Sequence, residues 1–249
     1  MVELAIVGGT LIDGNGGPPV EDSVITISGG RIVEAGARNG SSGPEAGQTI
    51  DAAGKFIMPG IINANVHLLD GWMMMTRGGV EYLARFEGRL HEVIEESSQI
   101  ALAAGMTTVM DTWNALQPVL HARDRIAAGT VQGARIFAAG NIMGMGGPFT
   151  VDFNKQACDV SSKTFVNRMN ALFEAGTGRR LAALTPEMIR PIVRDYLSKG
   201  VDMLKIAISD HIIPESMNPH LTFSPRVLRV MEEEARAAGV PLLSHATSV

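Results

Sequence analysis

The sequence predicts an α/β protein, with a small N-terminal β-sandwich unit in front of an incomplete (β/α)8 TIM-type barrel that contains strands one to five. Three observations predict this fold: short apolar runs cut by glycine turns at the start of the chain, strands that alternate with helices after Pro59, and only five such strands in 249 residues. We expect the β-sandwich part to cover residues 1–56 and the barrel part to cover residues 57–249.

The first 56 residues contain short β-type runs separated by turn residues. A hairpin is expected around Gly29-Gly30, because paired glycines permit the positive φ angles that tight hairpin turns require. The expected strands cover residues 4–7, 10–12, 23–27, 31–35 and 56–58. This pattern indicates a small, separate β unit.

Beyond Pro59 the chain alternates between strand-type and helix-type segments. Two helices begin with a capping residue followed by proline, at Thr185-Pro186 and Ser224-Pro225. Such alternation implies a parallel sheet, either doubly wound or curved into a barrel, and the lack of a phosphate-binding glycine loop favours the barrel. The expected strands cover residues 61–68, 107–112, 135–139, 203–209 and 240–245, and the expected helices cover residues 80–104, 118–128, 185–199 and 224–238.

Composition and charge exclude several classes of protein. The net charge of −5, without a basic patch, argues against a nucleic-acid partner. No apolar run reaches the roughly 18 residues that a membrane span needs. A single cysteine, Cys158, excludes an intrachain disulfide and fits a reducing compartment, so we expect a cytoplasmic protein that acts on a small molecule.

Three residues that can bind a metal lie on the expected barrel strands: His67 on the first, Lys205 on the fourth and His245 on the fifth. Active sites of such barrels form at the carboxyl ends of the strands, and Asn65 points to the same side as His67 because strand side chains alternate. A lysine within an apolar strand readily loses its proton. Each residue alone also has a purely structural explanation, such as a hydrogen-bonded core histidine or a lysine that reaches the sheet edge.

The order of these motifs along the chain resembles the amidohydrolase superfamily, in particular its imidazolonepropionase-like and prolidase-like branch. The resemblance runs from the opening β unit to the last residues. It includes the segments Leu11-Ile12-Asp13-Gly14, Gly29-Gly30-Arg31-Ile32, Ile50-Asp51-Ala52-Ala53-Gly54-Lys55, Pro59-Gly60, Ala104-Gly105, Ala134-Arg135, Gly200-Val201-Asp202-Met203-Leu204-Lys205 and Ser244-His245.

The resemblance implies a metal-dependent hydrolase that cleaves a carbon–nitrogen bond, such as that of an amide, lactam or cyclic amide, or a related bond. It implies one or two divalent metals, zinc among them, bridged by a carbamate on Lys205 and held by His67 and His245. A metal-activated water would attack the substrate carbon. The family's proton-shuttling aspartate, expected on an eighth strand, is missing from this sequence.

Two departures from the family pattern leave alternatives open. Asn65 replaces the first histidine of the family's His-x-His motif, and an amide oxygen is a weak zinc ligand. Either the first metal site is weak or vacant, leaving a mononuclear centre on Lys205 and His245, or Asn65 hydrogen-bonds substrate or backbone.

The second departure is the absence of strands six to eight. We expect a second polypeptide to supply them, within a larger hetero-oligomer; a truncated piece of a longer chain is the alternative. Two other functions stay open: a non-catalytic scaffold or regulatory subunit, and a metal-dependent enzyme that catalyses dehydration or cyclisation.

Further candidates flank the strand ends. His211, Trp113 and Asn114 are candidate substrate-binding residues, with Asp111 and His220 as weaker candidates. Residues 72–75 and 143–149 are apolar and rich in methionine, so they line a substrate pocket, pack in the core or contact a partner. The run 232–234 of three glutamates is expected to be a charged helix face and nothing more.

Overall fold

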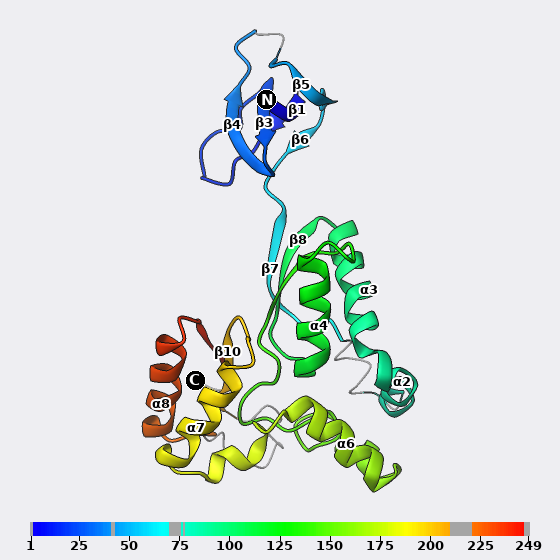
Figure 1. Cartoon of the computed structure of the whole chain (residues 1–249), viewed down its shortest axis with the longest axis vertical. Coiled ribbons are helices and arrows are strands. Elements are labelled where there is room, and N and C mark those ends of the chain that lie inside the picture. Colours follow the sequence, from blue (N-terminus) through cyan, green and yellow to red (C-terminus); the bar gives the residue numbers. More distant parts are fainter. Residues whose placement is uncertain (1, 41–42, 70–75, 77, 210–220, 247–249) are drawn as a thin grey trace. The chain divides into compact units, whose positions relative to one another are not determined.

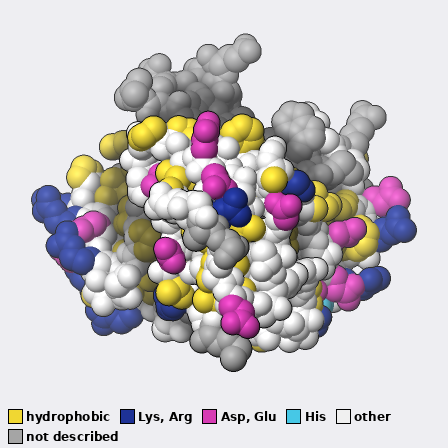
Figure 2. Space-filling view, turned by 90° about the horizontal axis from the view of Figure 1, so that it is seen from above, with side chains coloured by type: hydrophobic (Ala, Val, Ile, Leu, Met, Phe, Trp, Pro, Cys, Tyr) yellow, Lys and Arg dark blue, Asp and Glu magenta, His cyan; other side chains and the backbone are white. Residues whose placement is uncertain are grey.

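The computed structural model describes residues 2–40, 43–69, 76, 78–209 and 221–246. It divides into two compact units, residues 1–60 and residues 61–249 (Figure 1). Among the described residues, no helix is long and apolar enough to cross a bilayer. On the face shown in Figure 2, acidic side chains lie scattered among hydrophobic and uncharged ones.

The first unit is built on a four-stranded sheet with the order β4-β3-β1-β5. Its central strand β1 pairs antiparallel with β3 and parallel with β5, and a two-residue turn at Gly29-Gly30 joins β3 to β4. Both glycines have positive φ, as the predicted hairpin requires. The strands are β1 Val2–Val7, β2 Thr10–Leu11, β3 Ser23–Ser28, β4 Arg31–Ala37, β5 Ala46–Asp51 and β6 Phe56–Ile57.

In the described part of the second unit, five strands pair in parallel, each with a strand that is its neighbour in chain order. β7, β8 and β9 form one sheet, and β10 pairs with β11. Met143, in the loop after β9, links the two groups: it bridges to Ile206, and its backbone N–H donates to the Lys205 carbonyl (2.9 Å). The strands are β7 Ile61–Val66, β8 Met106–Asp111, β9 Arg135–Ala138, β10 Leu204–Ala207 and β11 Leu242–His245.

The helices lie between these strands, which gives the mixed α/β fold that the sequence predicts (Figure 1). The helices at Thr185 and Ser224 begin where expected, and each capping hydroxyl accepts from the N–H three residues later. The helices are α2 Gly79–Phe86, α3 Leu90–Ala103, α4 Leu116–Ala127, α5 Lys155–Asp159, α6 Lys163–Glu174, α7 Pro186–Leu197 and α8 Pro225–Ala237, with 3-10 helices η1 Glu87–Arg89 and η2 Arg179–Ala183.

Two differences from the sequence prediction concern the helices. The single helix expected over residues 80–104 is broken by η1, at a turn that contains Gly88, a poor helix former. Residues 148–184, where no element was expected, hold α5, α6 and η2. The buried face of α6, formed by Val166, Met169 and Phe173, has helical spacing and is the signal that was missed.

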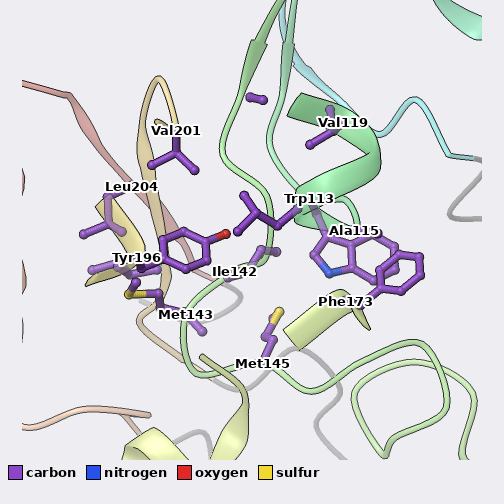
Figure 3. Close-up of a cluster of buried hydrophobic side chains, with 14 of the residues drawn as sticks. Trp113, Ala115, Val119, Ile142, Met143, Met145, Phe173, Tyr196, Val201 and Leu204 are labelled. Carbon is purple, nitrogen blue, oxygen red and sulfur yellow. The ribbon is translucent and has the colours of Figure 1, made fainter. Parts of the chain in front are cut away.

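The loop that follows β9 is packed into the core. Residues 141–149 are all buried, and Figure 3 shows Ile142, Met143 and Met145 beside Tyr196 and Trp113. The Tyr196 hydroxyl donates to the Ala139 carbonyl (2.8 Å) and accepts from the Asn141 N–H (2.7 Å), which fixes the start of the loop. Of the three roles left open for residues 143–149, core packing is the one observed.

Candidate functional site

The candidate ligands lie at one edge of the second unit. Because β7 to β11 run parallel, their carboxyl ends meet at the same edge of the sheet. His67 directly follows β7, His245 ends β11, and Lys205 lies two residues before the end of β10. The fold therefore places these predicted residues where barrel enzymes place their chemistry.

Lys205 and His245 share a face of the β10–β11 pair. The register pairs Lys205 with Leu243 and Ala207 with His245, and side chains two apart on a strand point the same way. The two side chains are therefore diagonal neighbours. Lys205 is only 7% exposed, and this burial lowers the pKa of its amine. A lowered pKa favours the neutral amine, which is the form that can react with carbon dioxide.

Asn65 is engaged with the neighbouring strand. Its Oδ1 accepts a hydrogen bond from the Thr112 hydroxyl, and its backbone N–H donates to Asn63 Oδ1 (3.2 Å). Asn65 thus hydrogen-bonds a side chain of the protein, a partner that neither sequence alternative named. An oxygen that already accepts a hydrogen bond has less lone-pair density to offer a metal.

His67 is exposed, and its ring packs edge-on against Trp113, with 5.5 Å between the ring centroids. Trp113 itself is 1% exposed. Its indole stacks on Phe153 at 4.2 Å, and Nε1 donates to Asn141 Oδ1 (3.2 Å). The Trp113 ring beside His67 is therefore held in place by the stacked Phe153 ring and by the hydrogen bond to Asn141.

Asp111 ends β8 and is completely buried. Its carboxylate accepts from the backbone N–H groups of Leu68 (3.1 Å) and Trp113 (3.3 Å) and from the Asn114 amide (2.7 Å). These donors favour the charged form, but burial outweighs them and raises the pKa of Asp111 to about 7. The hydrogen bond from Leu68 to Asp111 therefore links the residue after His67 to the end of β8.

Trp113 and Asn114 are both buried, so each would need a rearrangement to touch a substrate; their substrate-binding role stays a prediction. His211, His220 and residues 72–75 lie outside the described residues.

The donor set tests how well this chain could hold a metal. Within the described part of the chain, no three His, Cys, Asp or Glu side chains gather as a metal site. A carbamate on Lys205 would add a carboxylate-type ligand beside His245, and zinc accepts both oxygen and imidazole donors. The residues present thus fit part of a metal centre, with further ligands required from elsewhere.

A separate cavity of about 700 Å³ lies at the opposite ends of the strands. It is lined by the end of α4, the beginning of β9 and the turn that contains Gly200 and Asp202. Arg123 crosses this region and bonds Asp202 Oδ2 (2.8 Å). The cavity contains none of the candidate ligands.

Comparisons with known proteins point to one group of enzymes. No family model matches the sequence. An imidazolonepropionase from Methylobacterium sp. (strain 4-46) is 29% identical over 243 residues, which cover 91% of this chain and 54% of the relative. A 5-methylthioadenosine/S-adenosylhomocysteine deaminase from Symbiobacterium thermophilum is 29% identical over 164 residues, covering 59% of this chain and 36% of the relative.

Solved structures match more closely. Molinate hydrolase is 55% identical, with a TM-score of 0.93 over 99% of this chain and 54% of that one. Phenylurea hydrolase B is 51% identical, with a TM-score of 0.93 over 98% of this chain and 55% of that one. The chain spans about half the length of these proteins. It thus has the resemblance that its sequence predicted, to the amidohydrolase superfamily in its imidazolonepropionase-like and prolidase-like branch.

Proposed function

We propose that this chain is the N-terminal part of a metal-dependent hydrolase that cleaves a carbon–nitrogen or related bond in a small molecule. The observation that carries the proposal is Lys205, buried within a strand at the expected edge, with His245 on the same face of the next strand. Among the described residues Lys205 has no acidic partner, and a buried lysine in this setting is costly unless it is neutral or modified. Conversion of its amine to a carbamate explains why Lys205 occupies a buried position on β10.

Each residue has a defined task in this proposal. The neutral amine of Lys205 adds to carbon dioxide and releases a proton, and the carbamate oxygens become ligands. His245 and His67 each offer an imidazole nitrogen. A divalent metal, when bound, activates water and polarises the bond to be cleaved. Proton transfer to the leaving group falls to an aspartate on a strand outside this sequence.

The hydrogen bond from Thr112 to Asn65 supports a single metal over a pair. A first metal on His67 would have only the Asn65 amide oxygen as a second ligand from the same strand, and that oxygen already accepts the Thr112 hydrogen bond. We therefore propose a mononuclear centre on Lys205 and His245, to which His67 contributes its imidazole nitrogen.

The names of the two structures above 50% identity guide the substrate class. One is a phenylurea hydrolase, and the bond that links a urea carbonyl to its nitrogen is a carbon–nitrogen bond. The other is a molinate hydrolase. We propose a small, uncharged substrate with an amide-like or urea-like carbonyl group.

A further segment must complete the site. Among the described residues, β7 and β11 each pair with one strand only, so each has an unpaired edge. Ile61 and Ile62 on β7 are 47% and 63% exposed. Unpaired edges with exposed apolar residues promote association. We propose that strands six to eight come from a second polypeptide in a hetero-oligomer, or else from the remainder of a longer chain.

The test combines mass and metal content. We would purify the protein with its natural partners, measure its native mass spectrum and metal content, and compare Lys205→Ala with Lys199→Ala. Lys199 is a partly exposed lysine on the turn after α7. We expect carbamate mass and metal in the parent and in Lys199→Ala, and at least a tenfold weaker metal affinity in Lys205→Ala. Full metal content and activity in Lys205→Ala would contradict the proposal.

One observation favours a second candidate, a non-catalytic subunit. Asn65 stands where the family has a histidine, and it serves as a hydrogen-bond partner of Thr112. A completed protein that binds no metal and shows no turnover on amide or urea substrates would select this candidate.

A further inference from the structure

We propose that three consecutive residues at the end of β8, Asp111, Thr112 and Trp113, form a positioning segment for the Asn65-x-His67 pair. This inference rests on the proposed function, because it assigns a role to residues beside the proposed metal site. None of the three needs to touch substrate or metal. Each acts on a different part of the chain that carries Asn65 and His67.

Each of the three side chains makes a different contact with the chain around Asn65 and His67. Thr112 donates its hydroxyl hydrogen to Asn65 Oδ1. Trp113 presents its indole to the His67 ring at 5.5 Å. Asp111 Oδ2 accepts the backbone N–H of Leu68, the residue after His67, at 3.1 Å. The two side chains of the pair and the backbone beyond them are therefore all held by one short segment.

A local turn allows three neighbouring side chains to act in this way. In a regular strand, successive side chains point to opposite faces, so three in a row could not converge. β8 ends at Asp111, and Asp111 Oδ1 accepts the N–H of Trp113 (3.3 Å), two residues later. An aspartate that bonds the backbone two residues on forms a turn and redirects the residues that follow.

The segment is itself rigidly supported. Asp111, Thr112 and Asn114 have no exposed surface, and Trp113 has 1%. Asn141 accepts the indole N–H, and its own amide donates to the Met145 carbonyl (3.2 Å) and to Thr177 Oγ1 (3.3 Å). Rotamers locked by packing and hydrogen bonds are what a ligand needs if it is to keep a fixed orientation.

The experiment uses the complete protein, including whatever segment supplies strands six to eight, with Co²⁺ as the probe metal. Affinity is measured by competition with a chromogenic chelator, and ligand geometry by the visible absorption spectrum of bound Co²⁺. We expect Thr112→Val, which keeps the shape but loses the donor, to weaken Co²⁺ binding about 10–100-fold and to alter the spectrum. Thr112→Ser, which keeps the hydroxyl, should restore both, and Trp113→Phe should alter the spectrum.

Ser98→Ala is the matched control. Ser98 is also fully buried and also donates its hydroxyl, to the Ala134 carbonyl (3.0 Å), but this bond lies before the beginning of β9. We expect Ser98→Ala to lower stability while Co²⁺ affinity and spectrum stay unchanged. If Trp113→Phe fails to fold, the comparison of Thr112→Val with Thr112→Ser still tests the positioning role.

His67→Ala separates failure of this inference from failure of the proposed function. Weaker Co²⁺ binding in His67→Ala with parent-like binding and spectrum in Thr112→Val and Trp113→Phe would overturn the positioning role alone. Unchanged Co²⁺ binding in both His67→Ala and Lys205→Ala would overturn the proposed metal site and this inference with it.

Discussion

Asp111 shows how burial and hydrogen bonding oppose each other in one carboxyl group. Three N–H groups donate to it, yet it lies fully inside the protein, and its pKa rises to about 7. In the unfolded chain the value returns to about 3.8. At a pH between these two pKa values, the Asp111 carboxyl group therefore keeps its proton in the native state and has lost it in the unfolded state.

This difference predicts the pH dependence of stability. Because the folded pKa is the higher one, the contribution of Asp111 to the free energy of unfolding decreases as pH rises from about 4 to about 7, and then stays level. The total change is on the order of a few kcal/mol. Urea unfolding from pH 5 to pH 8 should show this decrease in the parent relative to Asp111→Asn, which cannot ionise. Parallel curves for the two proteins would contradict the assignment.

Gly140 provides a second prediction for a single residue. Its φ is +70°, and an added Cβ would lie 2.2 Å from the Tyr196 hydroxyl and 2.7 Å from Leu116. Gly140→Ala should therefore lower the free energy of unfolding by more than about 2 kcal/mol, through both backbone strain and overpacking. Gly176→Ala is the control, since Gly176 has φ +87° but no atom within 4 Å of its added Cβ. Equal losses in the two variants would show that only the backbone angle matters.

At the scale of elements, helices α7 and α8 are joined by one buried carboxylate. Glu234 on α8 accepts from Arg190 Nη1 (2.7 Å) and from Arg194 Nε (3.0 Å), both on α7. The two guanidinium groups, Arg194 foremost, hold the pKa of Glu234 below its usual value. The sequence predicted a charged helix face for residues 232–234 and nothing more; Glu234 in addition joins two helices, and its side chain is only 7% exposed.

The Glu234 contacts predict a helix-specific loss of stability. Glu234→Gln should lower the free energy of unfolding at neutral pH by about 1 kcal/mol, because both arginine partners are exposed. The loss should vanish as pH falls below the pKa of Glu234, where the parent carboxylate is also neutral. Glu232→Gln is the control, since its pairing with Arg236 lies within α8 and is exposed. A loss of the same size in Glu232→Gln would argue against a helix–helix link.

Much of the second unit was predictable because local signals and long-range packing agree there. Capping residues followed by proline marked the beginnings of α7 and α8, and apolar runs marked the five strands. Helix α6 was missed, since its twelve residues include polar ones that hide the apolar spacing. Lys205 and His245 stood out because each lies near the end of its strand, but the contact of Thr112 with Asn65 depends on the register of β7 against β8, which no local pattern encodes.

At the scale of the whole molecule, the edge of β7 that no described strand pairs with predicts where association occurs. Ile62 is 63% exposed on this edge, and Ile100 on α3 is 66% exposed. Ile62→Lys should leave the stability of this chain within about 0.5 kcal/mol of the parent, since the side chain is already in water. It should weaken assembly with the segment that completes the protein, measured by size-exclusion chromatography of a co-expressed complex. Ile100→Lys should have neither effect; impaired assembly in both variants would indicate a nonspecific cause.

The chain-ordered pairing of β7 to β11 also has a kinetic consequence. Within each of the two groups of paired strands, β7 to β9 and β10 with β11, the hydrogen bonds join strands that are consecutive along the chain, so none of these pairings waits for a distant, later part of the sequence. Strands can therefore be added one at a time while the chain is still leaving the ribosome. Within each group, the strand made earlier is already available as a pairing partner when the next strand of that group emerges.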